Sequence, residues 1–285
     1  MKLSVLYRGS LTSCNYACGY CPFAKRTESA TRLASDRESL DRFQTWITRQ
    51  TQHVWRILFT PWGEALVRAW YRESITRLTW VDQIESIAAQ TNLSCGLDWI
   101  DRCRIDRLAF WATYHPGEVR RAVFVAKVLR LHERGARVSV GTVGATEAFA
   151  QIESLRRELP AAIPVWVNPQ QPRPQPYTPA ELDFLSSIDP LFEVTSQPQR
   201  TFGMACRTGE TSFTVDGAGD IRRCHFVDDV IGNIGQDNWE QALAPRTCPN
   251  RSCRCYLGLA HFEPLGLDRH YGSNLLERIP LSGNE

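Results

Sequence analysis

The feature that most constrains the fold of this chain is an alternation of short β-type runs and longer helical segments over its first two-thirds. Apolar and β-branched runs predict strands at residues 2–7, 54–59, 86–91, 108–113, 138–143 and 163–167. Helical spacing and composition predict helices at residues 36–49, 64–78, 119–134, 146–159 and 179–187. Strand–helix units in this order are typical of a parallel α/β fold, in which the carboxyl ends of the strands form one rim that carries the chemistry. Periodicity alone leaves an open doubly wound sheet and a partial barrel as alternatives.

A proline-rich segment interrupts this pattern at residues 168–179, NPQQPRPQPYTP, which hold five prolines in twelve residues. As a linker it would be stiff, and as a loop after a strand it would lie over the active rim. We expect the loop, because Pro179 stands where the first turn of another helix begins.

Charge and hydropathy exclude several classes of partner. The chain has 285 residues, and its 33 basic and 31 acidic residues give no field that would gather nucleic acid. No run of about 18 apolar residues exists, so we expect no membrane partner. The start, MKLSVLYRGSLTSC, lacks the apolar core of a signal peptide, which favours a cytoplasmic protein.

Ten cysteines are more than such a protein needs for packing. Cys14, Cys18 and Cys21 have the spacing C-x3-C-x2-C in the loop after the first predicted strand. Three thiolates within eight residues can converge on one side of a cubane iron–sulfur cluster. A structural zinc site would need a fourth ligand nearby, and a disulfide would leave one cysteine over and require an oxidising compartment.

This motif, with Tyr20 directly before the third cysteine and with Asn15 and Pro22 beside it, resembles the radical SAM superfamily. The resemblance implies a partial (β/α)6 barrel of TIM type, in which the three cysteines hold a [4Fe–4S] cluster. S-adenosylmethionine (SAM) binds the open iron through its amino and carboxylate groups. One electron, from a donor such as flavodoxin or ferredoxin, then cleaves SAM to a 5′-deoxyadenosyl radical that abstracts hydrogen from the substrate.

The resemblance also implies SAM contacts from later segments. Gly63 and Glu64 match a Gly-Gly-Glu stretch, with Trp62 in place of the first glycine. An acidic residue favoured by a helix dipole is the alternative for Glu64, and a solvated helix face is the alternative for Arg120 or Arg121. The SAM contacts implied are Tyr20, Gly63, Glu64, Thr91, Asn92, Thr113, His115, Arg120 and Gly144.

The character of the chain changes after about residue 196. Residues 212–215 and 221–223 flank DGAGD, which predicts a hairpin. We therefore expect two domains, residues 1–196 and a small cysteine-rich Fe–S extension at residues 197–285, which resembles the SPASM/twitch extension of some radical SAM proteins. The candidate ligands of an auxiliary cluster are Cys206, Cys224, Cys248, Cys253 and Cys255.

The extension leaves its metal open. The resemblance implies a second [4Fe–4S] cluster held by Cys206, Cys224, Cys253 and one of Cys248 or Cys255. Zinc bound by four of the five is the alternative. Cys95 and Cys103 belong to neither group, and we expect them to be small buried apolar side chains.

These features together predict a radical SAM enzyme, oxidoreductase-like, that oxidatively modifies a ribosomally made peptide. Dehydrogenation of a small metabolite by the same chemistry is the alternative substrate class. A non-catalytic Fe–S or zinc binding protein is the alternative from another class. No winged-helix segment for a peptide leader precedes the first strand, so we expect that a partner would bring a peptide. The sequence indicates no further catalytic residue.

Overall fold

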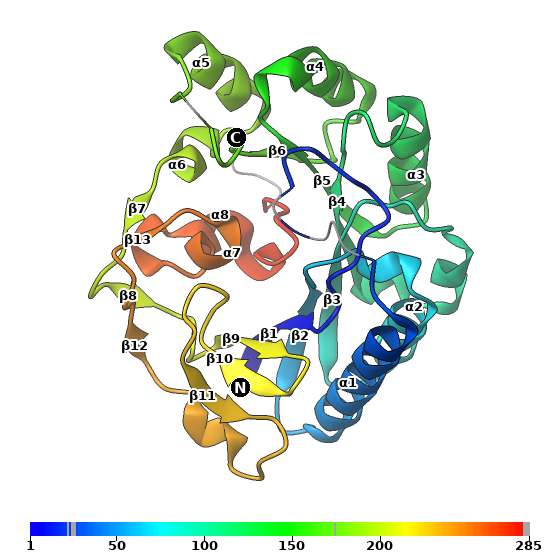
Figure 1. Cartoon of the computed structure of the whole chain (residues 1–285), viewed down its shortest axis with the longest axis vertical. Coiled ribbons are helices and arrows are strands. Elements are labelled where there is room, and N and C mark those ends of the chain that lie inside the picture. Colours follow the sequence, from blue (N-terminus) through cyan, green and yellow to red (C-terminus); the bar gives the residue numbers. More distant parts are fainter. Residues whose placement is uncertain (22, 24–26, 174, 282–285) are drawn as a thin grey trace.

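The computed structural model describes residues 1–21, 23, 27–173 and 175–281, and it has a mixed α/β fold (Figure 1). Nine strands form one sheet in the order β11-β10-β9-β1-β2-β3-β4-β5-β6. The six predicted strands are confirmed and pair in parallel in chain order, with bounds that shift by at most two residues. They are β1 (Lys2–Gly9), β2 (Val54–Phe59), β3 (Ile84–Thr91), β4 (Leu108–Thr113), β5 (Arg137–Val143) and β6 (Val165–Asn168).

The helices of the first two-thirds stand around the outside of this sheet (Figure 1). The first begins six residues before its predicted start, because the Ser29 side chain caps it by accepting a hydrogen bond from the Arg32 backbone. The segment predicted as a helix at residues 64–78 is divided, because the extended backbone of Arg68 separates a 3₁₀ turn at Ala65–Val67 from the helix. The helices are α1 (Ala30–Arg49), α2 (Ala69–Leu78), α3 (Arg121–Glu133), α4 (Phe149–Glu158), α5 (Pro179–Ile188) and α6 (Phe192–Ser196).

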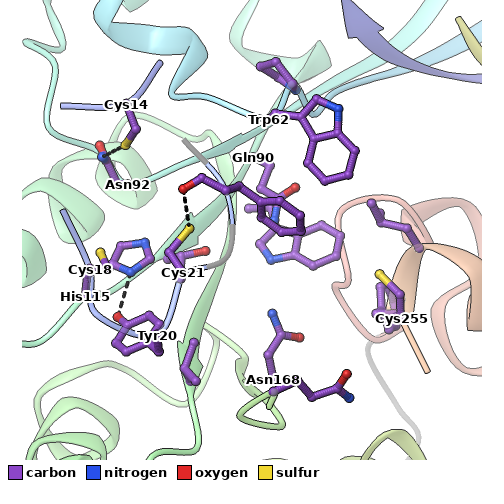
Figure 2. A pocket seen from close by; sticks show the side chains of 18 of the residues that line it. Cys14, Cys18, Tyr20, Cys21, Trp62, Gln90, Asn92, His115, Asn168 and Cys255 are labelled. Atoms are coloured by element: carbon purple, nitrogen blue, oxygen red, sulfur yellow. Dashed lines mark hydrogen bonds between the residues drawn. The ribbon is translucent and has the colours of Figure 1, made fainter. Parts of the chain in front are cut away.

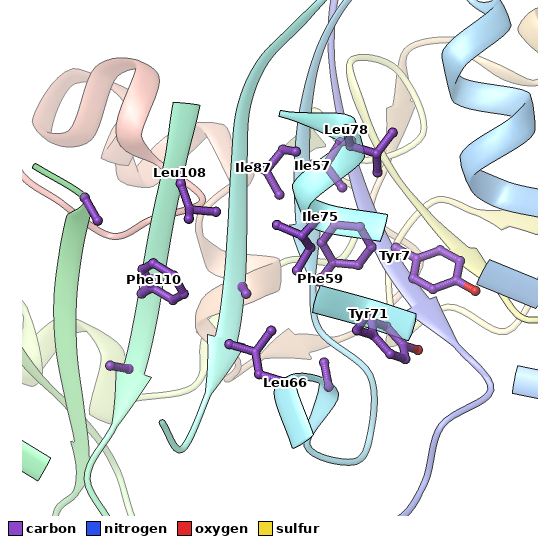
Figure 3. Close-up of a cluster of buried hydrophobic side chains, with 14 of the residues drawn as sticks. Tyr7, Ile57, Phe59, Leu66, Tyr71, Ile75, Leu78, Ile87, Leu108 and Phe110 are labelled. Atoms are coloured by element: carbon purple, nitrogen blue, oxygen red, sulfur yellow. The ribbon is translucent and has the colours of Figure 1, made fainter. Parts of the chain in front are cut away.

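The main hydrophobic core lies between the strands and these helices, as Figure 3 illustrates for β1 to β4 and α2. The Tyr7 ring packs 4.4 Å from that of Phe43, and Phe59 and Tyr71 close the cluster around it. Burial of each such side chain stabilises the fold by roughly 1.5–3 kcal/mol. The core therefore holds the carboxyl ends of β1 and β2 in place beneath the loops that follow them.

The predicted hairpin is present and extends the same sheet. β9 (Ser212–Asp216) pairs antiparallel with β10 (Asp220–Arg222) and parallel with β1, and β11 (Val230–Asn233) is the outer strand. Trp239 joins the main core, with its ring 5.9 Å from that of Trp55. Residues after 196 thus share a sheet and a core with the rest, and the division into two domains stays a prediction. Two short antiparallel pairs complete this part: β7 (Gln199–Arg200) with β13 (Ser252–Cys253), and β8 (Ala205–Cys206) with β12 (Arg246–Thr247).

The last segment of the chain fills the inner side of the sheet. α7 (Tyr256–Leu259) and α8 (Leu267–Tyr271) lie inside the ring of elements in Figure 1. They pack against inward side chains of β1, β2 and β4. Arg278, only 1% exposed, lies between the rings of Trp166 and Tyr256 and forms an ion pair with Asp189 at 3.1 Å. Because the buried guanidinium is paired, it anchors this segment to β6 and α5. None of the helices described is both long enough and apolar enough to span a bilayer.

Candidate active site

A cavity of about 600 Å³ opens at the carboxyl ends of the parallel strands (Figure 2). The cysteine loop after β1 covers one side of it, and the segment around Cys255 closes the other. Asn168, Pro169 and Gln171 also line it, so the proline-rich segment is a loop over this rim, as predicted. The predicted site residues that line the cavity are Cys14, Cys18, Tyr20, Cys21, Gly63, Glu64, Thr91, Asn92, Thr113, His115, Cys253 and Cys255.

The structure leaves other predicted positions outside this cavity. Arg120 is exposed just before α3 and is not among the lining residues. Its neighbour Arg121 forms an ion pair with Glu158 at 2.7 Å. Gly144 is buried, and a Cβ there would lie 3.1 Å from Tyr177 Oη rather than face the cavity. Pro22 lies outside the described residues.

Hydrogen bonds from distant segments hold the beginning of the cysteine loop. Glu28 accepts from the backbone and hydroxyl groups of both Thr12 and Ser13, and these hydrogen bonds hold the pKa of its carboxyl below the usual value despite partial burial. The Gly63 backbone donates to Leu11 O, and the Glu64 backbone donates to Ser13 O at 3.0 Å. A Cβ on Gly63 would lie 2.1 Å from Ser13 O, so a glycine is required where the two backbones meet.

Glu64 joins the end of β2 to the end of β3. Its side chain is 5% exposed and burial raises its pKa. The carboxylate accepts from Thr91 Oγ1 at 2.6 Å and from the Asn92 backbone at 2.6 Å. A third bond comes from the Leu66 backbone at 3.0 Å, which caps the 3₁₀ turn. Protein donors thus already hold both carboxylate oxygens, and the carboxylate fixes the positions of the two rim residues beside it.

Asn92 links this rim to the cysteine loop. Its side-chain amide donates to Asn15 Oδ1 at 3.1 Å and lies 3.7 Å from Cys14 Sγ. The Tyr16 backbone also donates to Cys14 Sγ, at 3.4 Å. Burial raises the pKa of the Cys14 thiol, and it raises that of Cys18 to about 11. Burial therefore disfavours the free thiolates of Cys14 and Cys18. A bound metal would compensate the negative charge that burial penalises.

The other end of the cysteine loop packs on His115, which follows β4. The Tyr20 hydroxyl is hydrogen-bonded to His115 Nδ1 at 2.8 Å, and the two rings stack at 6.0 Å. The Tyr16 ring meets the same imidazole edge-on at 6.0 Å. Burial lowers the pKa of His115 to about 4, so the imidazole is neutral at pH 7.

Three thiols from one loop are donors of the kind that an iron–sulfur cluster requires. All ten cysteines are free of disulfides, and three of them face the cavity from one loop. Within residues 1–21, 23, 27–173 and 175–281, no three His, Cys, Asp or Glu side chains are grouped closely enough to hold a metal ion. A single zinc requires all its ligands around one point, whereas the cysteines of a cubane bind separate irons and stand further apart.

A second group of thiols lies beside this cavity. Cys224 interacts electrostatically with Cys206 and Cys248, and Cys253 interacts with Cys255, Cys224 and Cys248. Burial raises the pKa of Cys224 to about 11 and that of Cys253 to about 12. The β8–β12 pair brings the segments of two of these cysteines together, since the Cys248 backbone donates to Met204 O at 2.9 Å, two residues before Cys206.

Cys255 lines the main cavity together with Cys253, and Arg8 and Arg278 are its charged neighbours. Burial raises the pKa of its thiol. Cys253 thus has both Cys248 and Cys255 as neighbours, whereas Cys224 has Cys206 and Cys248. Cys95 is buried against the main core, as expected, but Cys103 is only half-buried there.

The sequence analysis did not identify every residue that lines the cavity. Among those it missed, Arg8, Gln90 and Trp111 project from β1, β3 and β4 to the inner side of the sheet. Gln90 accepts a hydrogen bond from Thr60 Oγ1 at 2.6 Å. Alternation along the first strand would have placed Arg8 on the face of Leu6, since residues two apart share a face.

Comparisons with known proteins bear on the fold. No family model and no curated protein matches this sequence. A solved structure of native anSMEcpe with bound AdoMet and Kp18Cys peptide has a TM-score of 0.57 and 12% identity, over 85% of this chain and 80% of that one. A hexahistidine-tagged form of anSMEcpe with bound AdoMet has a TM-score of 0.56 and 14% identity, and the Cp18Cys peptide complex has 0.55 and 15%, at the same coverage. The chain thus has the fold of these AdoMet-bound structures.

Proposed function

We propose that this protein is a radical SAM enzyme whose first cluster is held by Cys14, Cys18 and Cys21. When bound, the reduced cluster and SAM would supply a 5′-deoxyadenosyl radical that abstracts hydrogen from the substrate. The observation that carries the proposal is the meeting of these three thiols with Glu64 in one cavity, at the carboxyl ends of parallel strands. The likeness in fold to AdoMet-bound structures supports it.

The residues of the chain supply position and exclusion of water. Glu64 fixes the rim beside the cysteine loop, and the neutral His115 holds Tyr20. Phe23 and Trp62, with ring centroids 4.4 Å apart, line the cavity beside Cys21. An apolar lining of this kind keeps a radical away from solvent. The proposed SAM contacts are the lining residues Tyr20, Gly63, Glu64, Thr91, Asn92, Thr113 and His115.

The second group of thiols is proposed to hold an auxiliary [4Fe–4S] cluster. Its ligands would be Cys206, Cys224, Cys248 and Cys253, because Cys224 neighbours Cys206 and Cys248, and Cys253 neighbours Cys224 and Cys248. Zinc bound by four of the five C-terminal cysteines is the alternative. The extension at residues 197–285 is proposed as the unit that carries this cluster. The auxiliary cluster would accept the electron left on a substrate radical, so that the substrate is oxidised in the net reaction.

The proposed substrate is a peptide. A peptide accompanies AdoMet in the anSMEcpe complexes, and here apolar side chains surround the mouth of the cavity, with Phe23 46% and Phe226 44% exposed. Dehydrogenation of a small metabolite is the second candidate, favoured by the cavity volume, which lies within the roughly 300–1,000 Å³ of small-molecule sites. A cytoplasmic location and a flavodoxin or ferredoxin as electron donor belong to the same proposal.

The test is formation of 5′-deoxyadenosine from SAM by anaerobically reconstituted protein with dithionite. We expect formation by the natural chain, loss in Cys18→Ala, and retention in the matched variant Cys103→Ala, whose thiol bonds Thr76 far from the cavity. No 5′-deoxyadenosine from protein that carries iron and sulfide would refute the enzyme and leave a non-catalytic Fe–S binding protein.

A further inference from the structure

Arg8 is a cation inside the cavity without an acidic partner. It projects from the end of β1, and its Nη1 donates to Thr60 O at 2.7 Å. Its guanidinium lies 3.6 Å from the centroid of the Trp62 ring. The Nε is buried and has no hydrogen-bond partner among the described residues. Arg8 also takes part in no ion pair within the described chain, and Cys255 is the neighbour that acts on its charge.

The rest of the cavity does not neutralise this charge. Of the Arg, Lys, Asp and Glu residues described, those that line the cavity are Arg8, Arg254 and Glu64. Glu64 accepts hydrogen bonds from Thr91, Asn92 and Leu66, and among the described residues it forms no ion pair with Arg8. Arg254 adds a second positive charge on the side of Cys255. The cavity is therefore electropositive, and a buried cation of this kind favours an anionic ligand.

A second polar group in the cavity also has no partner. Trp111 is 2% exposed and lines the floor, and its Nε1 donor is unpaired among the described residues. Buried donors are normally satisfied. Trp111 Nε1 is thus a second donor in the wall of the cavity that lacks a partner in the described chain, on β4, with β2 and β3 between it and β1.

Arg8 lies on the far side of the cavity from Cys18 and His115. Figure 2 shows Trp62 and Cys255, the neighbours of Arg8, across the cavity from these two residues, with Cys21 between them and Trp62. In the proposed function, the carboxylate of SAM binds at the cluster of the cysteine loop. An anion at Arg8 then belongs to the substrate.

We infer that the substrate carries a carboxylate that Arg8 binds, with Trp62 stacked beneath the guanidinium. A planar guanidinium suits a carboxylate because its N–H groups match the two oxygens in one plane. This inference rests on the proposed function and names its substrate class: a peptide or metabolite with a free carboxylate close to the reacting carbon.

The test compares two probes that differ only in charge, hippurate (N-benzoylglycinate) and its amide. Dissociation constants are measured by calorimetry on the reconstituted protein saturated with SAM. We expect hippurate to bind about tenfold more tightly than the amide, as is usual for a charge-assisted hydrogen bond. The preference is expected to fall below about twofold in Arg8→Gln and to stay near tenfold in Arg254→Gln. Arg8→Lys, which retains charge but not the planar fork, is expected to lie between the two. Iron content and thermal unfolding of each variant show that it has folded.

Several results would overturn the inference. Equal affinities for the two probes, or no binding of either, would remove the carboxylate site. If the preference for hippurate is lost in Arg254→Gln but not in Arg8→Gln, then Arg254, and not Arg8, binds the carboxylate. A preference seen without SAM but abolished by it, with weaker SAM binding in Arg8→Gln, would identify the carboxylate of SAM as the occupant. The 5′-deoxyadenosine assay on the same preparation separates the two proposals, because turnover without the preference refutes only the carboxylate site.

Discussion

The Tyr20 hydroxyl and His115 Nδ1 lie 2.8 Å apart, although 95 positions separate the two residues in the chain. His115 follows β4, which the parallel pairs with β3 and β5 hold in register. The stacked rings and their hydrogen bond therefore attach the far end of the cysteine loop to the central strands of the sheet. The position of the candidate cluster thus depends on the sheet as well as on the loop that carries the thiols.

Removal of this attachment is expected to impair the site more than the fold. Tyr20→Phe and His115→Phe each remove one net hydrogen bond, so the free energy of unfolding should fall by about 1 kcal/mol. The rate of 5′-deoxyadenosine formation should fall by about tenfold in each variant, because the loop loses its fixed end. Denaturant unfolding and the SAM-cleavage assay measure the two effects. In the double variant, the second substitution should add little to the losses of stability and of SAM-cleavage rate that the first one causes. Losses that add in full would show that Tyr20 and His115 act separately.

The contact of Gly63 with the cysteine loop gives a second prediction. A Cβ there would lie 2.1 Å from Ser13 O and 2.8 Å from Ser13 N, both backbone atoms. Gly63→Ala should therefore displace the segment directly before Cys14 and abolish SAM cleavage. Gly96→Ala is the matched control, since a Cβ there would meet no described heavy atom within 4 Å. Iron content measured with activity separates a displaced cluster from a failure to fold. Full activity of Gly63→Ala would contradict the close approach.

Features that depend on residues close together in the chain were predictable from the sequence. Each apolar run of β1 to β6 is bounded by turn residues, and the three loop thiols stand within eight residues, so neighbouring positions suffice to identify them. The hairpin of β9 and β10 was predictable for the same reason. What sequence alone could not give is its parallel pairing with β1, because that contact joins residues about two hundred positions apart.

Long-range hydrogen bonds account for the other differences. The carboxylate of Glu64 bonds the end of β3 as well as its own 3₁₀ turn, and this tertiary contact divides a segment whose composition predicts one helix. Asp36, fully buried, accepts from Ser10, Trp70 and Tyr71 and so joins α1 to the loop and to α2. No local pattern marks an aspartate on a helix as a buried acceptor of this kind.

The grouping of the C-terminal thiols gives a third prediction. In a chain that carries Cys14→Ala, Cys18→Ala and Cys21→Ala, the remaining iron reports the auxiliary cluster alone. Addition of Cys206→Ala, Cys224→Ala, Cys248→Ala or Cys253→Ala should remove that iron. Addition of Cys255→Ala should retain it, because Cys248 rather than Cys255 is the proposed fourth ligand, as a neighbour of both Cys224 and Cys253. Iron and sulfide analysis with electron paramagnetic resonance measures this. Zinc without sulfide would identify a structural metal site, and loss of the cluster in Cys255→Ala but not in Cys248→Ala would reverse the assignment.

His261 gives a pH dependence of stability. Its side chain is 5% exposed and its Nε2 is hydrogen-bonded to Ser212 Oγ at 3.1 Å. Burial, with a smaller effect of Arg207, lowers the pKa of His261 to about 4. The unfolded chain, where the imidazole titrates near its ordinary value of 6.5, then binds the proton more readily than the folded chain.

Stability from this residue is therefore complete above about pH 6.5 and is lost as the pH falls toward 4. Between pH 7 and pH 5 the free energy of unfolding should fall on the order of 2 kcal/mol through this group alone. His261→Gln should remove that part of the pH dependence, because glutamine can bond Ser212 and does not titrate. His132→Gln, at an exposed position on α3, is the matched control and should keep it. If the unfolding curves of the natural chain and of His261→Gln shift equally between pH 7 and pH 5, the buried imidazole does not set the acid sensitivity of the fold.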